Sequence, residues 1–207
     1  MKKEEKTRRT YERIMTAAME EFGTKSYDAA SLTTLCNENQ ISKGLIYHNF
    51  KNKDELYLKC VEECFEKMTL CFKNSDCQGK SVQERIHDLF SARQHFFEGN
   101  PYYANLFFQT VLQPPRHLEE EIRTLRREYD EFYEECFRSL LQQMELRDGI
   151  NTDTAVEYIR VFLEMFNGYF QRRSCKDEDI HTLIQNHEVN LSKILDIMLY
   201  GIAKEDL

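Results

Sequence analysis

Apolar residues recur every three or four positions along nearly the whole chain of 207 residues. Val61, Phe65, Met68 and Phe72, for example, stand at i, i+4, i+7 and i+11, a spacing that places all four on one face of a helix. No long segment alternates between apolar and polar positions as a strand does, and glycine and proline fall mainly between the periodic segments. This pattern predicts an all-α protein.

Residues that start and stop helices divide the pattern into segments. Gly23 is the expected end of the first helix, whereas Ser31, Ser42 and Asn52 have side chains that can cap the next three, and Ser81–Glu84 reads as a capping box. The expected helices cover about residues 10–22, 32–36, 43–47, 53–72, 82–97, 101–112, 116–147, 154–172 and 177–200.

Two short helices joined by a tight turn follow the first helix. This is the arrangement of a helix-turn-helix unit, whose second short helix enters the major groove of DNA. At the start of that helix, Lys43 can reach a phosphate or a guanine edge, Gly44 lets the backbone approach closely, and Leu45 can pack against a thymine methyl. The candidate DNA contacts are Ser31, Thr33, Ser42, Lys43, Gly44, Leu45, Tyr47, His48, Asn49, Lys51 and Lys53.

This region resembles the DNA-binding signature of the TetR family of bacterial regulators. The similarity runs through SLTTLC at residues 31–36, ISKGLIYHNF at 41–50 and KDEL at 53–56, and Ile14, Ala17, Ala18, Phe22 and Gly23 match the family's first helix. The resemblance implies an N-terminal three-helix helix-turn-helix DNA-binding domain over residues 1–51. It also implies a C-terminal helical effector-binding and dimerisation domain over residues 52–207.

Four positions depart from the family pattern. Cys36 and Asn39 replace the usual alanines, Gln40 replaces the usual turn glycine, and Asn49 replaces the usual histidine, with His48 one residue earlier. Glutamine tolerates a left-handed backbone poorly. Asn39 is therefore the residue expected to supply that conformation in the turn.

Charge is distributed unevenly along the chain, whose formal net charge is −8. Residues 1–60 hold 11 Lys and Arg against 9 Asp and Glu, whereas the remaining residues hold 17 against 27. The first part is therefore the one that tolerates a polyanion. This asymmetry agrees with an N-terminal DNA-binding domain and an acidic second domain.

The second part of the chain carries broad apolar surfaces on its helices. The seventh helix is expected to end near Gly149 and to bury a stripe of Leu118, Ile122, Leu125, Tyr129, Phe132 and Cys136. The last two helices are apolar on two sides, which indicates either a central core helix or a dimer interface built as a four-helix bundle. The candidate interface residues are Ile159, Phe162, Phe166, Tyr169, Phe170, Ile184, His187, Leu191, Ile194 and Met198.

The resemblance also implies a small-molecule pocket in the C-terminal domain. Aromatic residues are abundant there, and although most of them are expected to form ordinary core, a few polar side chains among them can orient a ligand. The candidate pocket residues are Phe65, Met68, Phe72, Phe90, Arg93, Phe97, Tyr103, Phe107, Gln109, Tyr129, Phe132, Phe166 and Asn167. We expect a largely apolar effector with one polar end.

The resemblance finally implies a mechanism. A homodimer reads a palindromic operator in double-stranded DNA, and an effector that prefers a different spacing of the two recognition helices releases it. Repression is the expected mode, and the fourth helix is the expected lever. We expect no cofactor and no membrane association, and a cytoplasmic protein, because no apolar run is long enough to span a bilayer.

Two other classes of function stay open at this stage. No GxSxG, HExxH or phosphate-binding glycine loop is present, so an enzyme is disfavoured. A helical protein-interaction module, or a thiol or metal sensor that uses Cys60, Cys64 and Cys71, is the alternative to operator binding. The seven cysteines form no CxxC pair, which favours reduced and buried thiols without a metal.

Overall fold

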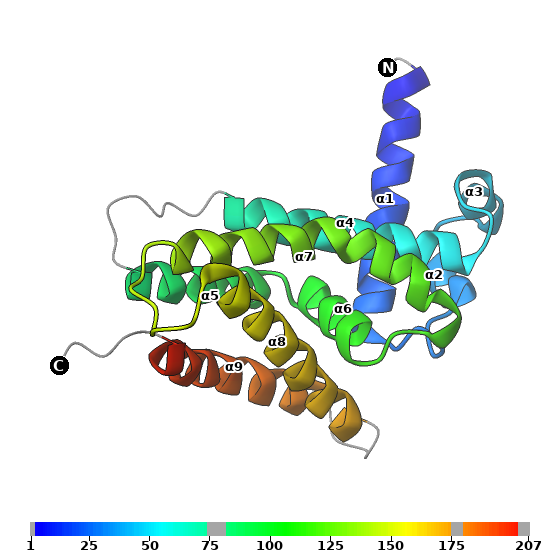
Figure 1. Cartoon of the computed structure of the whole chain (residues 1–207). Coiled ribbons are helices and arrows are strands. Elements are labelled where there is room, and N and C mark those ends of the chain that lie inside the picture. Colours follow the sequence, from blue (N-terminus) through cyan, green and yellow to red (C-terminus); the bar gives the residue numbers. More distant parts are fainter. Residues whose placement is uncertain (1–2, 74–81, 175–179, 203–207) are drawn as a thin grey trace. The chain divides into compact units, whose positions relative to one another are not determined.

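The computed structural model describes residues 3–73, 82–174 and 180–202, and within these ranges all regular structure is helical (Figure 1). This confirms the predicted fold class. The elements are α1 (Lys3–Thr24), α2 (Leu32–Glu38), α3 (Lys43–Asn49), α4 (Lys53–Lys73), α5 (Val82–Gly99), α6 (Pro101–Leu112), the 3-10 turn η1 (Arg116–Leu118), α7 (Glu119–Leu141), α8 (Thr152–Ser174) and α9 (Ile180–Ile202).

The chain divides into two compact units. Unit 1 comprises residues 1–66 and 100–126, and unit 2 comprises residues 67–99 and 127–207. Unit 1 therefore contains the whole predicted DNA-binding domain together with α6, η1 and the start of α7. The helices α4 and α7 each contribute residues to both units.

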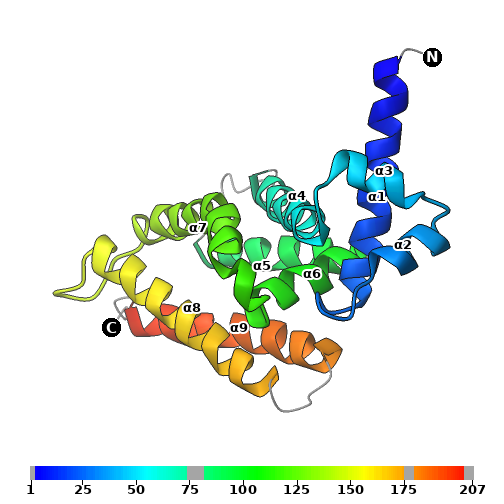
Figure 2. The ribbon, with the colours of Figure 1, turned by 90° about the vertical axis from the view of Figure 1, so that its right-hand side faces the viewer.

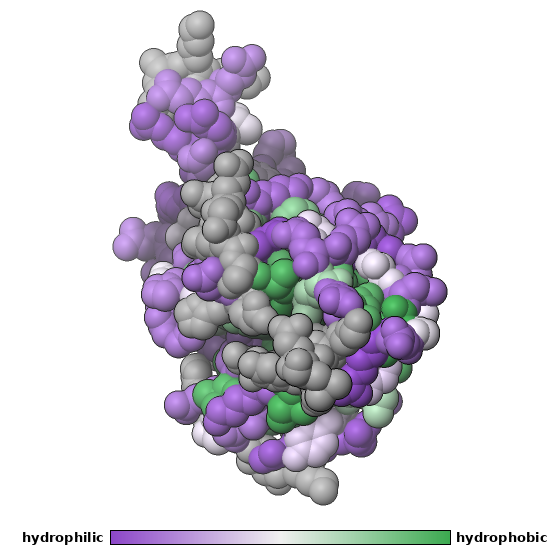
Figure 3. Space-filling view, turned by 60° about the vertical axis from the view of Figure 1, so that its left-hand side comes forward, coloured by the Kyte–Doolittle hydropathy of each residue, from purple (hydrophilic) through white to green (hydrophobic). Residues whose placement is uncertain are grey.

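The first helix is longer than predicted, because α1 begins at Lys3 and continues through Gly23 to Thr24. Its outer turns carry hydrophilic residues (Figure 3), and ion pairs one turn apart support them. Arg9 Nη2 lies 2.8 Å from Glu5 Oε1, a spacing that stabilises exposed helices.

Gly23 does not stop the helix but lies where α1 crosses α6 (Figure 2). A Cβ atom added at Gly23 would lie 2.6 Å from Tyr102 Cβ and 2.7 Å from both Tyr102 Cα and Tyr102 O. The Asn105 side-chain amide also donates a hydrogen bond to the Gly23 carbonyl oxygen, at 2.8 Å. The glycine thus allows two helix backbones to touch.

The turn between α2 and α3 corrects a second prediction. Asn39 has an ordinary φ of −102°, whereas Gln40 takes the left-handed conformation with φ 51°. The Ile41 N–H donates to the Cys36 carbonyl at 2.9 Å, which is the closure of a helix end that requires a left-handed residue. Arg13 Nη2 then donates to the carbonyl oxygens of Asn39 at 3.0 Å and Gln40 at 2.6 Å, which ties the turn to α1.

The seventh helix is shorter than predicted. It ends at Leu141, where the N–H groups of Gln143 and Met144 bond to carbonyls three residues back, and Gly149 lies in a later turn with φ 84°. Its buried stripe also differs: Tyr129 is buried as expected, but Tyr133 and Phe137 follow it at steps of four. A helix has 3.6 residues per turn, so positions spaced by alternating steps of four and three drift slowly around it. The predicted members Leu125, Phe132 and Cys136 are therefore only half-buried.

The remaining helix boundaries agree with the sequence within a few residues. Asn52 caps α4 through its side-chain oxygen, which accepts from the Glu55 N–H at 2.9 Å. The expected cap at Ser81 and the expected start of the last helix at Asp177 lie outside the described residues.

Candidate nucleic-acid interface

Capping residues fix where α2 and α3 begin. The Ser31 hydroxyl accepts from the Thr34 N–H at 3.4 Å, and the Ser42 hydroxyl accepts from the Leu45 N–H at 3.3 Å. The Ser31 N–H is also occupied, since it donates to Glu21 Oε1 at 2.7 Å. Both serines therefore act first as N-caps, and they position the helices that carry the other candidates.

One side of α3 packs against the core of unit 1, and the opposite side is exposed to solvent. Ile46 is 1% exposed and Phe50, just after the helix, is 3% exposed, so both belong to the core of unit 1. The opposite side leaves Tyr47 54% exposed. The candidate contacts that are exposed are Thr33, Ser42, Lys43, Gly44, Tyr47, His48 and Lys51.

Gly44 lies in the first turn of α3, and among the described residues it has no packing contact that requires a glycine. A Cβ atom added there would meet nothing within 4 Å. A glycine at this position lowers helix stability without any gain inside the described part of the chain. A glycine here leaves room for the close approach of an external surface.

Two of the predicted contacts are used within the chain. The Asn49 side-chain amide donates to the Leu45 carbonyl oxygen at 2.8 Å, so it turns back onto its own helix. The Lys53 ammonium lies 4.3 Å from the centre of the Tyr27 ring, and burial lowers the pKa of Lys53. This cation–π contact holds the start of α4 against the loop after α1.

The same loop forms a polar cluster with η1. The Tyr27 hydroxyl donates to the Asp54 carboxylate, and His117 Nε2 lies 3.3 Å from the same oxygen, Asp54 Oδ1. Burial and the hydrogen bond to Asp54 raise the pKa of Tyr27, while the bond from Tyr27 lowers the pKa of Asp54. The start of α4 is thereby joined to the loop before α2 and to η1, all within unit 1.

The predicted pocket residues are divided between the two units. Phe65, Tyr103, Phe107 and Gln109 lie in unit 1, where the rings of Phe65 and Phe107 pack at 5.6 Å. The members in unit 2 are Met68, Phe72, Phe90, Arg93, Phe97, Tyr129, Phe132, Phe166 and Asn167.

Within unit 2, Arg93 and Asn167 belong to a buried polar cluster. Arg93 Nη2 lies 2.6 Å from Glu188 Oε1, and the same carboxylate oxygen lies 3.0 Å from His187 Nδ1. His187 Nε2 lies 2.9 Å from Asn167 Oδ1. Sequence reasoning did not find Glu188, since an acidic residue next to an apolar stripe is common on a solvated helix edge.

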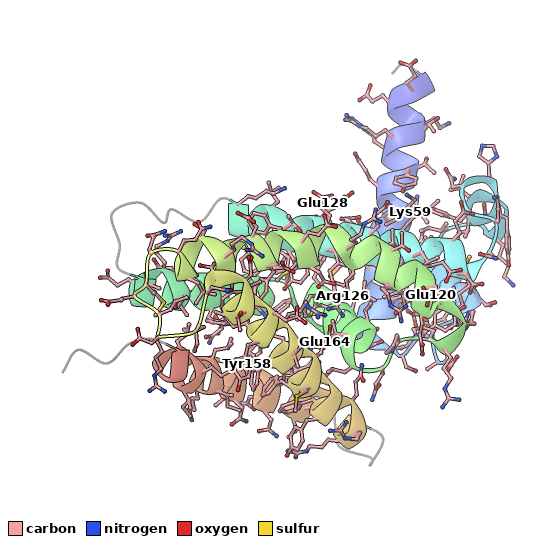
Figure 4. All side chains as sticks on the ribbon, viewed as in Figure 1. Lys59, Glu120, Arg126, Glu128, Tyr158 and Glu164 are labelled. Carbon is pink, nitrogen blue, oxygen red and sulfur yellow. The ribbon has the colours of Figure 1, made fainter. Side chains whose placement is uncertain are left out.

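The predicted interface residues are mostly covered by their own chain. Ile159, Phe166, Phe170, His187, Leu191 and Met198 are buried, Phe162, Ile184 and Ile194 are half-buried, and Tyr169 is exposed. Another row of α8 is uncovered, and Tyr158 and Glu164 mark that helix in Figure 4. Its apolar members are Tyr158, Val161, Met165 and Tyr169, which are 58%, 39%, 68% and 49% exposed.

Two of the three α4 thiols that the sensor alternative would use are closed off from solvent. Cys60 and Cys64 are buried, and burial raises the pKa of Cys60 far above its ordinary value. The Cys64 thiol donates to the Tyr103 carbonyl oxygen at 3.5 Å. A buried and protonated thiol is a poor nucleophile and metal ligand, and no group of three or more metal-binding side chains occurs in the described part of the chain.

A capped helix pair with one exposed face, followed by a helical domain, defines a helix-turn-helix DNA-binding regulator. Residues 14–60 match the family model described as bacterial regulatory proteins of the tetR family. Residues 80–203 match a second model, described as a tetracyclin repressor-like C-terminal domain. The chain belongs to the TetR family, and it is a DNA-binding transcriptional regulator of the repressor type.

Two curated relatives are regulators as well. Over 131 residues the chain is 28% identical to the biofilm operon icaADBC HTH-type negative transcriptional regulator IcaR of Staphylococcus epidermidis, covering 59% of this chain and 69% of that protein. It is 25% identical over 171 residues to the HTH-type transcriptional regulator YvkB of Bacillus subtilis, covering 80% and 84%. The family and these relatives are transcription regulators and not enzymes.

Solved structures share the fold at low sequence identity. The regulator FadR of Bacillus subtilis, in complex with stearoyl-CoA, has a TM-score of 0.59 at 17% identity, covering 88% of this chain and 97% of that one. A gamma-butyrolactone receptor (ArpA-like protein) has a TM-score of 0.62 at 17% identity, covering 96% and 90%. None of the helices in the described residues is long and apolar enough to cross a membrane.

Proposed function

We propose that the protein binds a palindromic operator as a homodimer and is released from it by a small, largely apolar effector. The exposed side of α3 is the observation that carries the DNA contacts of this proposal. There Gly44 has open space beside it and Tyr47 is exposed, while Ile46 anchors the helix from behind. A helix held in this way presents its first turn to the major groove.

The specific contacts follow from this side of α3. We assign Lys43, Tyr47 and His48 to the bases or the phosphates at the groove, and Lys51 to the backbone of the duplex. Thr33, exposed on α2, is assigned to a phosphate. Asn49 and Lys53 are assigned indirect roles, because their side chains hold α3 and α4 in place.

The dimer forms, in this proposal, through the uncovered row of α8. Tyr158, Val161, Met165 and Tyr169 recur at steps of three and four, so they form one continuous stripe. A row of exposed apolar side chains is unfavourable in water unless a partner covers it. Two copies related by a two-fold axis cover each other's stripe and place two recognition helices on one palindrome.

Release by the effector is proposed to act through α6. This helix touches α1 at Gly23, and its Tyr102 hydroxyl donates to Glu20 Oε1 of α1 at 3.4 Å. Because no side chain separates the two helices at Gly23, α1 has to follow a displacement of α6. An effector that favours a shifted α6 therefore weakens the binding of DNA. By reciprocity, bound DNA weakens the binding of the effector by the same factor.

The test is selection of bound duplexes from a random library by the purified chain, at two salt concentrations. We expect an enriched palindrome with half-sites about one helical turn apart and binding that falls steeply with salt. The selection is repeated with protein that has been denatured, stripped of bound molecules and refolded. If neither preparation enriches a duplex at low salt, the proposal is wrong.

A further inference from the structure

The buried polar cluster of unit 2 joins helices that are far apart in sequence. Arg93 comes from α5, Asn167 from α8, and His187 and Glu188 from α9. The side chains of Arg93 and His187 are 6% and 3% exposed, whereas that of Glu188 is 22% exposed. The cation is therefore enclosed inside unit 2, whereas its carboxylate partner Glu188 still reaches solvent.

The cluster has no clear value for stability. A buried ion pair loses so much hydration that apolar residues of the same volume often stabilise a fold as well or better. Unit 2 has ample apolar material, since Phe166 and Phe170 pack their rings 4.8 and 5.0 Å from His187. Charged groups retained inside such a core are candidates for a binding site.

A tyrosine beside Arg93 strengthens this assignment. The Tyr133 hydroxyl is buried and makes no hydrogen bond of ordinary geometry within the described structure. Burial raises the pKa of Tyr133 to about 12, against the opposing charge of Arg93. The group is therefore a neutral donor without a good acceptor, which costs free energy in the absence of a ligand. Tyr129 stacks on it at 5.8 Å.

The charges of the cluster define what it can accept. Burial raises the pKa of Glu188, but the Arg93 charge and the contacts with His187 together outweigh burial, so the pKa is lowered. Burial also lowers the pKa of His187, so this ring is neutral at pH 7. Arg93 and Glu188 thus compensate each other, and a second carboxylate fits beside Arg93 only when the Glu188 carboxylate leaves.

We propose that Arg93 and the Tyr133 hydroxyl form a site for the carboxylate of an apolar or aromatic effector, and that this carboxylate replaces Glu188 on the guanidinium. A guanidinium donates two parallel hydrogen bonds to a carboxylate, and the tyrosine hydroxyl adds a third. The ring of Phe97 lies 5.7 Å from the guanidinium carbon, so apolar surface is available next to the charge. The inference rests on the proposed function for its biological role, but the binding event can be measured without DNA.

Radiolabelled benzoate is the probe, measured by equilibrium dialysis against the full chain at pH 7. In Glu188→Gln the competing charge is gone, so we expect benzoate to bind about tenfold tighter or more than to the wild type. Arg93→Gln should abolish this binding. Benzamide, which lacks the charge, should compete poorly for all variants, whereas acetate should compete.

The matched control is Glu157→Gln. This residue also lies in an ion pair with an arginine, Arg160, but on the exposed side of α8, so benzoate affinity should stay at the wild-type value. Each variant must first unfold cooperatively with a helical circular dichroism spectrum. If Glu188→Gln binds benzoate no better than the wild type, or Arg93→Gln still binds it, the inference is overturned.

Tyr133→Phe separates a binding role from a structural one. Removing a buried hydroxyl without a good acceptor should leave the melting temperature unchanged or higher, while benzoate affinity falls several-fold. Tyr133→Phe also tests the inference if Glu188→Gln does not fold. In that case the inference is overturned if Tyr133→Phe binds benzoate as tightly as the wild type, or if the wild type does not bind benzoate. A failure of operator selection with intact benzoate binding would instead count against the proposed function.

Discussion

Two glycines of unit 1 lie inside helices, and contacts among the described residues explain only one of them. At Gly23 the backbone of α1 meets Tyr102 so closely that no side chain fits. At Gly44 the added methyl group meets nothing within 4 Å. The first glycine is required by the fold, whereas the second is an unfavourable choice for the fold. The difference separates a position that packs the protein from one that, in the proposed function, faces DNA.

Replacement of Gly23 should have the largest effect on the stability of the fold. In Gly23→Ala the new methyl group overlaps the backbone and Cβ of Tyr102, which cannot move aside as a flexible side-chain tip does. Overpacking that forces a backbone to shift lies near the upper end of a range of about 1–3 kcal/mol, which exceeds the gain of about 1 kcal/mol that alanine brings to a helix. We expect a loss of at least about 1 kcal/mol in the free energy of unfolding, measured by urea denaturation.

Gly44→Ala should have the opposite effect on stability and a large effect on DNA binding. The free energy of unfolding should rise by up to about 1 kcal/mol, since the methyl group is unhindered and alanine favours a helix. Affinity for the selected operator should fall about tenfold to a hundredfold, because the methyl group keeps the start of α3 away from the duplex. Operator affinity equal to that of the wild type would contradict the role assigned to α3.

The uncovered row of α8 extends the comparison, because in the proposed function it too faces a partner, the second copy of the chain. Met165→Glu places a charge on the stripe where Met165 is 68% exposed. We expect a folded monomer whose dimer dissociation constant rises about a hundredfold or more in sedimentation experiments, since each charge occurs twice in a two-fold interface. Leu70→Glu, at a residue on α4 that is 57% exposed, is the control and should leave association unchanged.

Local signals in the sequence predicted the helix pair well, and contacts between distant residues were missed. Ser31, Ser42 and Asn52 cap their helices as expected, because a cap is decided by a few neighbouring residues. The role of Gly23 could not be predicted, since it depends on Tyr102 from another helix. The pairing of Arg93 with Glu188 joins residues 95 positions apart, and no spacing rule within a helix indicates it.

Gln40 and Gly44 depart from expectation in opposite directions. At position 40 the backbone conformation favours glycine but the sequence has glutamine, whereas at position 44 the helix disfavours glycine but the sequence has it. A left-handed conformation costs an ordinary residue about 1–2 kcal/mol, and glycine loses part of this advantage through its larger entropy in the unfolded chain. We expect Gln40→Gly to raise the free energy of unfolding by about 0.5–1 kcal/mol. Asn39→Gly, at a residue with φ −102°, should lower it, and a stabilising effect there would show that the turn is assigned to the wrong residue.

The smallest expected effect concerns the polar cluster that holds the start of α4. The hydrogen bond from Tyr27 lowers the pKa of Asp54 in the folded protein. The unfolded chain therefore takes up the proton first, so the stabilisation is present above about pH 4 and is lost as the pH falls through the folded-state pKa. Because Asp54 is 36% exposed, this pH-dependent stabilisation should stay below about 1 kcal/mol.

The free energy of unfolding, followed by urea denaturation from pH 6 to pH 3, should fall less for Asp54→Asn than for the wild type. Asp148→Asn, at an exposed residue, should follow the wild-type curve. If Asp54→Asn follows it too, the contact of Tyr27 with Asp54 does not stabilise unit 1, and the cation–π contact of Lys53 with Tyr27 is left to hold α4 to that loop.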